Sequence, residues 1–200
     1  DDVINVAISD ETFNDIVKRI QKNMKSKNID NVDLIIGGPP CQAYSIVGRA
    51  RIKEKVVDDP RNFLYKYYVK FLKKFNPKMF IFENVPGILS ASNGEHFSNI
   101  KTAINEAGYH MEPRELIASD YGVLQDRKRI IIVGWKIDKK KKEKYEYPDF
   151  EKIKNLYTVS DVLKDLPEIE PGSIKEGKGL YKYKTNNYLV LSNIREEGFD

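Results

Sequence analysis

An apolar run that ends abruptly at two glycines and two prolines constrains the fold of this chain more than any other stretch. Residues 34–36 have the composition of a buried strand, and Gly-Gly-Pro-Pro at 37–40 then breaks it. Proline fixes φ and lacks an N–H, so this turn cannot continue as a helix or an inner strand. Cys41, the only cysteine, follows at once. A lone cysteine is often a small buried hydrophobe, but a thiol on a rigid turn at the carboxyl end of a strand is also where an α/β enzyme presents a reactive group.

Strands and helices alternate along the first 135 residues. Apolar runs predict strands over residues 3–8, 34–36, 79–82 and 130–135, with a weaker one over 109–118. Helical spacing of apolar residues predicts helices that start after Ser9, at Pro60 and near Phe97, the last one closed by Gly108. Because strand, helix and strand follow one another, we expect an α/β fold with a parallel sheet.

Composition narrows the class of protein. Lys and Arg number 34 against 30 Asp and Glu, a formal charge of +4 that is compatible with nucleic acid without being diagnostic of it. No apolar run approaches the roughly 20 residues that cross a bilayer, so we expect no membrane association. A single cysteine excludes an internal disulfide and a cysteine-based zinc cluster. It fits a reducing, cytoplasmic setting, and the sequence predicts no metal site.

The composition and the hydrophobic periodicity of the chain change after about residue 148. A short helix is predicted over residues 157–166, and a Lys/Gly/Tyr-rich segment without periodicity follows. We therefore predict one domain over residues 1–150 and a linker into a second region over residues 151–200. The lysine run at 139–144 is typical of a solvated loop and is assigned no site.

Four polar side chains lie at the ends of predicted central strands: Cys41, Glu83, Arg127 and Arg129. Cys41 and Glu83 follow their strands, so they can converge at the carboxyl edge of the sheet. The two arginines precede their strand and reach that edge only where the strand runs antiparallel. A nucleophile, a carboxyl acid and guanidinium donors would then line one cleft.

These residues lie in three short motifs: Gly-Pro-Pro-Cys-Gln at 38–42, Glu-Asn-Val at 83–85 and Gln-Asp-Arg-Lys-Arg at 125–129. In order and spacing they resemble signature motifs of the cytosine-5 DNA methyltransferases, over roughly residues 30–135. The resemblance implies a Rossmann-like S-adenosylmethionine-dependent methyltransferase sheet, mostly parallel with one antiparallel strand and incomplete at both ends. It also implies that residues 1–150 are a partial catalytic domain and that 151–200 lead into the target-recognition region.

The resemblance assigns a role to each candidate catalytic residue. A cytosine must leave the duplex before its ring can be attacked. The Cys41 thiolate would then add to C6 and form a covalent intermediate. Glu83 would hold or protonate N3, while Arg127 and Arg129 would bind O2. S-adenosylmethionine would supply the methyl group for C5.

Further sites follow from the same resemblance. Pro39 and Leu64 match positions that line the cofactor pocket, and Asp10 is a candidate contact to the adenine. The remaining candidates, which lie where the family's catalytic loop meets DNA, are Gln42, Ser45 and Arg49. The implied partner is double-stranded DNA, in a bacterial restriction-modification system with a cognate restriction endonuclease and with no obligate protein partner.

The family's glycine-rich cofactor motif is not found in this sequence, and we expect it to precede Asp1. We likewise expect the closing motifs to follow Asp200. Residues 1–200 alone are therefore expected not to methylate DNA.

Three other interpretations stay open. A relative that acts on transfer RNA would use the same chemistry, although the Cys-Phe-Thr tripeptide associated with that branch does not occur here. The chain could instead be one half of a split enzyme or an inactive DNA-binding homologue. A cysteine hydrolase would require a histidine base, and neither His96 nor His110 stands in a recognisable triad context.

Overall fold

The computed structural model describes residues 3–40, 63–138, 145–153 and 157–163. The chain divides into two compact units. The first unit comprises residues 1–116 and 128–149, and the second comprises residues 117–127 and 150–200. This division does not test the predicted roles of residues 1–150 and 151–200, which stay predictions.

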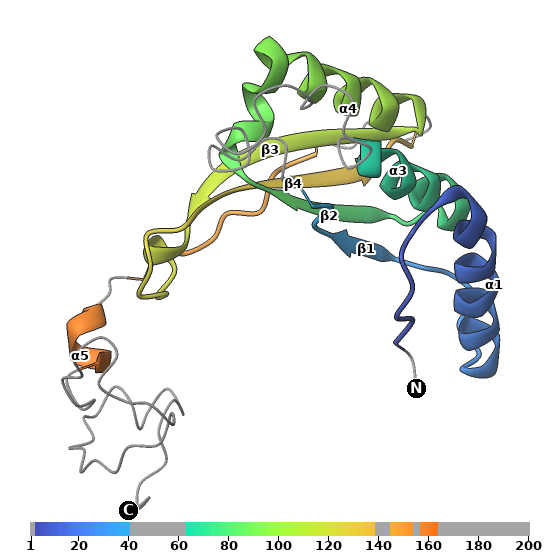
Figure 1. Ribbon diagram of the computed structural model, residues 1–200, viewed down its shortest axis with the longest axis horizontal. Helices are drawn as coiled ribbons and strands as arrows, with labels where there is room; N and C mark the ends of the chain where they lie inside the picture. The colour runs from blue at the N-terminus through green and yellow to red at the C-terminus, as the bar shows by residue number, and fades with distance from the viewer. Residues whose placement is uncertain (1–2, 41–62, 139–144, 154–156, 164–200) are drawn as a thin grey trace, which may run out of the picture. The chain divides into compact units, whose positions relative to one another are not determined.

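A four-stranded mixed sheet forms the centre of the first unit, with the strand order β1-β2-β4-β3 (Figure 1). Its strands are β1 (Leu34–Gly37), β2 (Met79–Asn84), β4 (Lys128–Lys136) and β3 (Tyr109–Ile117). β1 and β2 are parallel, whereas β4 runs antiparallel to β2. The α/β class and the antiparallel direction of β4 are therefore confirmed.

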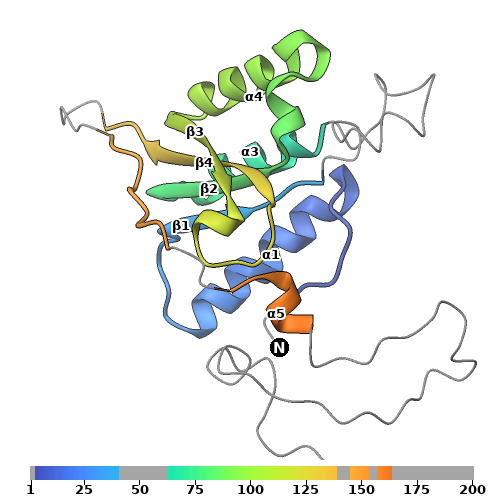
Figure 2. The same cartoon turned by 90° about the vertical axis from the view of Figure 1, so that its left-hand side faces the viewer.

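Helices α3 (Leu64–Phe75) and α4 (Glu95–Glu106) pack on one face of this sheet, as Figures 1 and 2 show. The apolar core lies between them and the strands, and Leu72, Phe80 and Ile132 are fully buried in it. Burial of each such side chain stabilises the fold by about 1.5–3 kcal/mol. At the ends of these helices, Asn76 adopts the left-handed conformation after α3, and Gly108, with a φ of 87°, follows α4 as predicted.

Helix α1 (Asp10–Ser26) lies on the β1 side of the sheet, away from α4 (Figure 2). Its start matches the prediction, because the Ser9 side chain accepts a hydrogen bond from the N–H of Thr12. The Phe13 ring contacts the Phe71 ring of α3, with their centroids 4.9 Å apart. Helix α1 is therefore anchored to α3 through aromatic packing.

Four sequence predictions about these strands need correction. Residues 3–8 form no strand in the described structure, because their backbone pairs with no neighbouring strand there. β1 is not buried in the described structure, where it lies at the edge of the sheet and Ile36 is 68% exposed. Glu83 does not follow β2 but lies within it, and Arg129 likewise lies within β4.

The second unit is described only in part. Residues 118–120 form a short 3-10 helix, and Tyr121 makes a parallel bridge to Ile153. The Lys152 ammonium lies 2.7 Å from the Asp120 carboxylate. Helix α5 spans Val159–Leu163, within the predicted 157–166; the last three residues of that prediction lie outside the described structure.

Candidate active site

Glu83 and Arg129 form an ion pair on one face of the sheet. Side chains two residues apart in a strand point to the same face, and Glu83 pairs with Ile131 across the β2–β4 ladder. Arg129 is therefore the diagonal neighbour of Glu83. Its Nε lies 2.7 Å from Oε1 of Glu83, with the Arg129 side chain 22% exposed and the Glu83 side chain 43% exposed. A carboxylate and a guanidinium that both remain accessible can each offer a polar group to a ligand.

The turn after β1 lies directly against Glu83. A Cβ placed on Gly38 would be 2.8 Å from Oε2 of Glu83. The neighbouring residue in β2, Asn84, is 3% exposed and donates a long hydrogen bond, 3.4 Å, from Nδ2 to the carbonyl of Pro39. The carboxylate and the turn that leads to Cys41 therefore meet at the carboxyl edge of two parallel strands.

The other two candidate catalytic residues are not placed beside this pair. Cys41 lies outside the described residues. Arg127 belongs to the second unit, where its N–H donates to the carbonyl of Gln125 and its carbonyl accepts from the N–H of Ala118. Convergence of Cys41 and Arg127 with Glu83 stays a prediction, as do the DNA contacts of Gln42, Ser45 and Arg49, which also lie outside the described structure.

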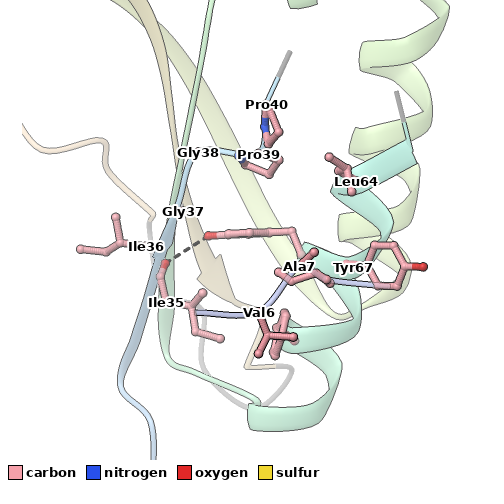
Figure 3. Close-up of a pocket in the computed structure, with 13 residues that line it drawn as sticks. Val6, Ala7, Ile35, Ile36, Gly37, Gly38, Pro39, Pro40, Leu64 and Tyr67 are labelled. Atoms are coloured by element: carbon pink, nitrogen blue, oxygen red, sulfur yellow. Dashed lines mark hydrogen bonds between the residues drawn. The ribbon is translucent and has the colours of Figure 1, made fainter. Parts of the chain in front are cut away.

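A cavity of about 560 Å³ opens beside the same turn. Pro39 and Leu64, both predicted to bind a cofactor, line it together (Figure 3). The rest of its wall is mostly apolar and includes Val6, Tyr67 and Phe71. A concave, largely apolar space of this volume is typical of small-molecule sites.

Tyr68 lines this cavity and is hydrogen-bonded to the sheet. Its hydroxyl donates to the carbonyls of Ile35 and Ile81, at 3.1 and 2.9 Å, and Figure 3 draws the first of these bonds. Burial raises the pKa of Tyr68 far above its ordinary value. Sequence analysis did not identify this residue, because a tyrosine on the apolar face of a helix gives no signal of which carbonyls it will meet.

Asp10 lines a different cavity from Pro39. That cavity, of about 480 Å³, shares Ile8, Leu64 and Tyr67 with the first. The Asp10 carboxylate lies 2.6 Å from the Lys70 ammonium, and its hydrogen bond with Lys70 holds the pKa of Asp10 below its usual value. Asp10 is therefore already paired, at the rim of the adjoining space rather than in the wall of the larger cavity.

The described residues include neither a candidate membrane span nor a candidate metal cluster. No helix among them is both long enough and apolar enough to cross a membrane. Within the same part of the chain, no three or more His, Cys, Asp or Glu side chains gather as metal ligands.

Comparison with known proteins identifies the family. The chain is 42% identical to the Type II methyltransferase M.Bpa9945I of Bacillus paralicheniformis, over 85% of this chain and 40% of that protein. It is 34% identical to the Type II methyltransferase M.MthTI of Methanothermobacter thermautotrophicus, over 84% of this chain and 52% of that protein. The chain therefore spans about half or less of the length of these relatives.

A solved structure agrees with these sequence matches. A DNA modification methyltransferase encoded in an E. coli prophage superposes with a TM-score of 0.55 and 31% identity, over 78% of this chain and 39% of that one. The sequence model for the C-5 cytosine-specific DNA methylases matches residues 5–197, almost the whole chain. This chain belongs to the C-5 cytosine-specific DNA methylase family.

Proposed function

We propose that this chain carries the catalytic centre of an enzyme that methylates C5 of cytosine in double-stranded DNA. The observation that supports this most strongly is the Glu83–Arg129 pair, which lies against the turn that leads to Cys41. Family membership and the Type II methyltransferase relatives give the proposal its substrate and its setting, a bacterial restriction-modification system. In that setting a separate restriction endonuclease would cut the same sequence when it is unmethylated.

The chemistry begins once the target cytosine has left the duplex, because C6 is otherwise shielded within the stack. The Cys41 thiolate forms a bond to C6, and the electron pair of the C5–C6 double bond moves toward C5. Glu83 would hold or protonate N3, which stabilises the charge that develops in the ring. Arg129 and Arg127 donate hydrogen bonds to O2.

Loss of the C5 proton to solvent then re-forms the C5–C6 double bond and expels Cys41 as the thiolate, while a proton taken up at N3 returns to Glu83. Covalent catalysis of this kind divides one difficult step into two easier ones. S-adenosylmethionine, when bound, supplies the methyl group that C5 accepts between these two steps.

The cavity of about 560 Å³ beside the turn after β1 is large enough to hold S-adenosylmethionine. Pro39 and Leu64, which both line the cavity, would hold it. Asp10 lies at the rim of the adjoining cavity, from which a contact to the adenine is proposed.

The experiment uses the full-length protein, labelled S-adenosylmethionine and duplex DNA that contains 5-fluorocytosine. Fluorine replaces the C5 proton, so the second step cannot occur and the covalent adduct accumulates. We expect an adduct with wild type and none with Cys41→Ser. Glu83→Gln should slow its formation, whereas Glu106→Gln, an exposed carboxylate on α4, should not.

Two results would contradict the proposal. An adduct with transfer RNA and none with DNA would favour the alternative substrate. Retention of the adduct in Cys41→Ser would remove the proposed nucleophile.

A further inference from the structure

We propose that Gly38 is a positioning residue, which holds the Glu83 carboxylate in place by the absence of a side chain. This inference rests on the proposed function and deepens it. It concerns the step in which Glu83 acts on the ring of the target base. It also explains why residue 38 is a glycine, which its backbone conformation does not require.

Backbone conformation does not require glycine at position 38. The glycines of the described structure with positive φ, where other residues are strained, are Gly94, Gly108 and Gly122. Gly38 is not among them, so its backbone can accommodate an alanine. The remaining reason for glycine is a close approach by another group.

That group is Glu83. The three heavy atoms nearest to a Cβ on Gly38 all belong to Glu83: Oε2 at 2.8 Å, the backbone oxygen at 3.6 Å and Cβ at 3.8 Å. Only the first of these distances is too short, and Oε2 is the tip of a flexible side chain. A methyl group at position 38 would therefore leave the fold intact and displace the carboxylate.

The carboxylate has little freedom to move without losing its partner. Its Oε1 lies 2.7 Å from Nε of Arg129, while Oε2 lies against Gly38. The turn cannot readily retreat, because Gly37 pairs with Phe82 in the β1–β2 ladder and Asn84 reaches the carbonyl of Pro39. The absence of a side chain at Gly38 therefore determines the position of the Glu83 carboxylate relative to the turn before Cys41.

The adjacent glycine provides a matched control. A Cβ on Gly37 would lie 2.8 Å from Cε2 of Tyr68. That ring is 7% exposed and its hydroxyl is tied to two backbone carbonyls, so it cannot swing aside. Gly37→Ala should therefore disturb the cavity and its ligand, while Gly38→Ala should disturb Glu83.

The test measures the rate of adduct formation with 5-fluorocytosine DNA in the full-length protein, together with S-adenosylmethionine affinity and melting temperature. Misplacement of a reacting group by about 1 Å can cost 10²-fold in rate, so we expect Gly38→Ala to slow adduct formation by about tenfold or more. Cofactor affinity and melting temperature should remain close to wild type. Gly37→Ala should instead weaken cofactor binding and lower the melting temperature.

A second variant separates an effect through Glu83 from a general defect. Glu83→Asp withdraws the carboxylate by one methylene and clears the space beside position 38. In that background Gly38→Ala should change the residual rate by less than about twofold, because the two substitutions act on the same contact and are not additive.

Equal slowing by Gly38→Ala in both backgrounds would overturn the inference while the proposed function stands. A wild-type rate for Gly38→Ala would overturn it in the same way. If wild type forms no adduct at all, the proposed function fails and the role of Gly38 fails with it.

Discussion

Removal of the Tyr68 hydroxyl tests how α3 is joined to the sheet beside the candidate cofactor cavity. Tyr68→Phe keeps the ring, which packs edge-on against Phe80 and Phe82 with centroids 5.9 and 5.1 Å away. It deletes only the oxygen that reaches the carbonyls of Ile35 and Ile81. The fold and the shape of the cavity should therefore survive.

The size of the effect follows from that geometry. The hydroxyl carries one proton, shared between acceptors at 3.1 and 2.9 Å in a site where the tyrosine is 7% exposed. A hydrogen bond contributes about 0.5–1.5 kcal/mol net, and two half-buried carbonyls lose this donor. We expect Tyr68→Phe to destabilise the β1–β2 region by about 1–2 kcal/mol, which corresponds to a factor of about 5–30 in an opening equilibrium.

Hydrogen–deuterium exchange of peptides that cover β1 and β2 measures this directly. Their protection should fall by that factor in Tyr68→Phe. Tyr67→Phe is the control, because the Tyr67 hydroxyl contributes only a minor hydrogen bond, to the exposed Asp10. A change of less than twofold in Tyr68→Phe, or an equal change in both variants, would refute the reasoning.

Three further predictions concern stability. Burial raises the pKa of Tyr109 to about 12 and that of Tyr68 still higher. The stability that these two buried tyrosines contribute is complete below about pH 10, the pKa of tyrosine in the unfolded chain, and is lost as pH rises toward their folded-state pKa values. The melting temperature should therefore fall above about pH 10, and it should fall less steeply in Tyr68→Phe. Gly134→Ala should lower stability by about 1–3 kcal/mol or more in chemical denaturation, because its Cβ would overlap the buried Phe80 ring, and an unchanged midpoint would contradict this. Asp10→Asn should alter the melting temperature little, since its ion pair with Lys70 is exposed; a shift as large as that of Gly134→Ala would show otherwise.

Local signals in the sequence correctly predicted several features. Ser9 caps α1 because its hydroxyl oxygen accepts a hydrogen bond from a backbone N–H in the first turn of the helix. This contact depends only on residues that are close in sequence. Gly108 ends α4 for an equally local reason, its positive φ. The antiparallel direction of β4 followed from a different argument, that the arginines before a strand had to reach the same sheet edge as Glu83.

The incorrect predictions share a physical cause. Each feature depends on a contact with a segment that is distant in the chain, and the local sequence does not reveal that contact. Residues 3–8 alternate like a strand, but a strand also needs a neighbour to complete its hydrogen bonds, and none pairs with them in the described structure. The run 34–36 is apolar enough to be central but lies at the edge of the described sheet. The close approach of Gly38 to Glu83 likewise depends on the register of two strands 45 residues apart and could not be predicted from either motif alone.

Peptide mapping of the trapped complex tests the central claim most directly. The full-length protein is incubated with S-adenosylmethionine and 5-fluorocytosine DNA, digested, and analysed by mass spectrometry for the residue that carries the nucleotide. The account predicts a single linkage, at the sulfur of Cys41, with the methyl group already on the attached ring. A linkage at any other side chain, or a methylated product formed with no linkage to the protein, would contradict it.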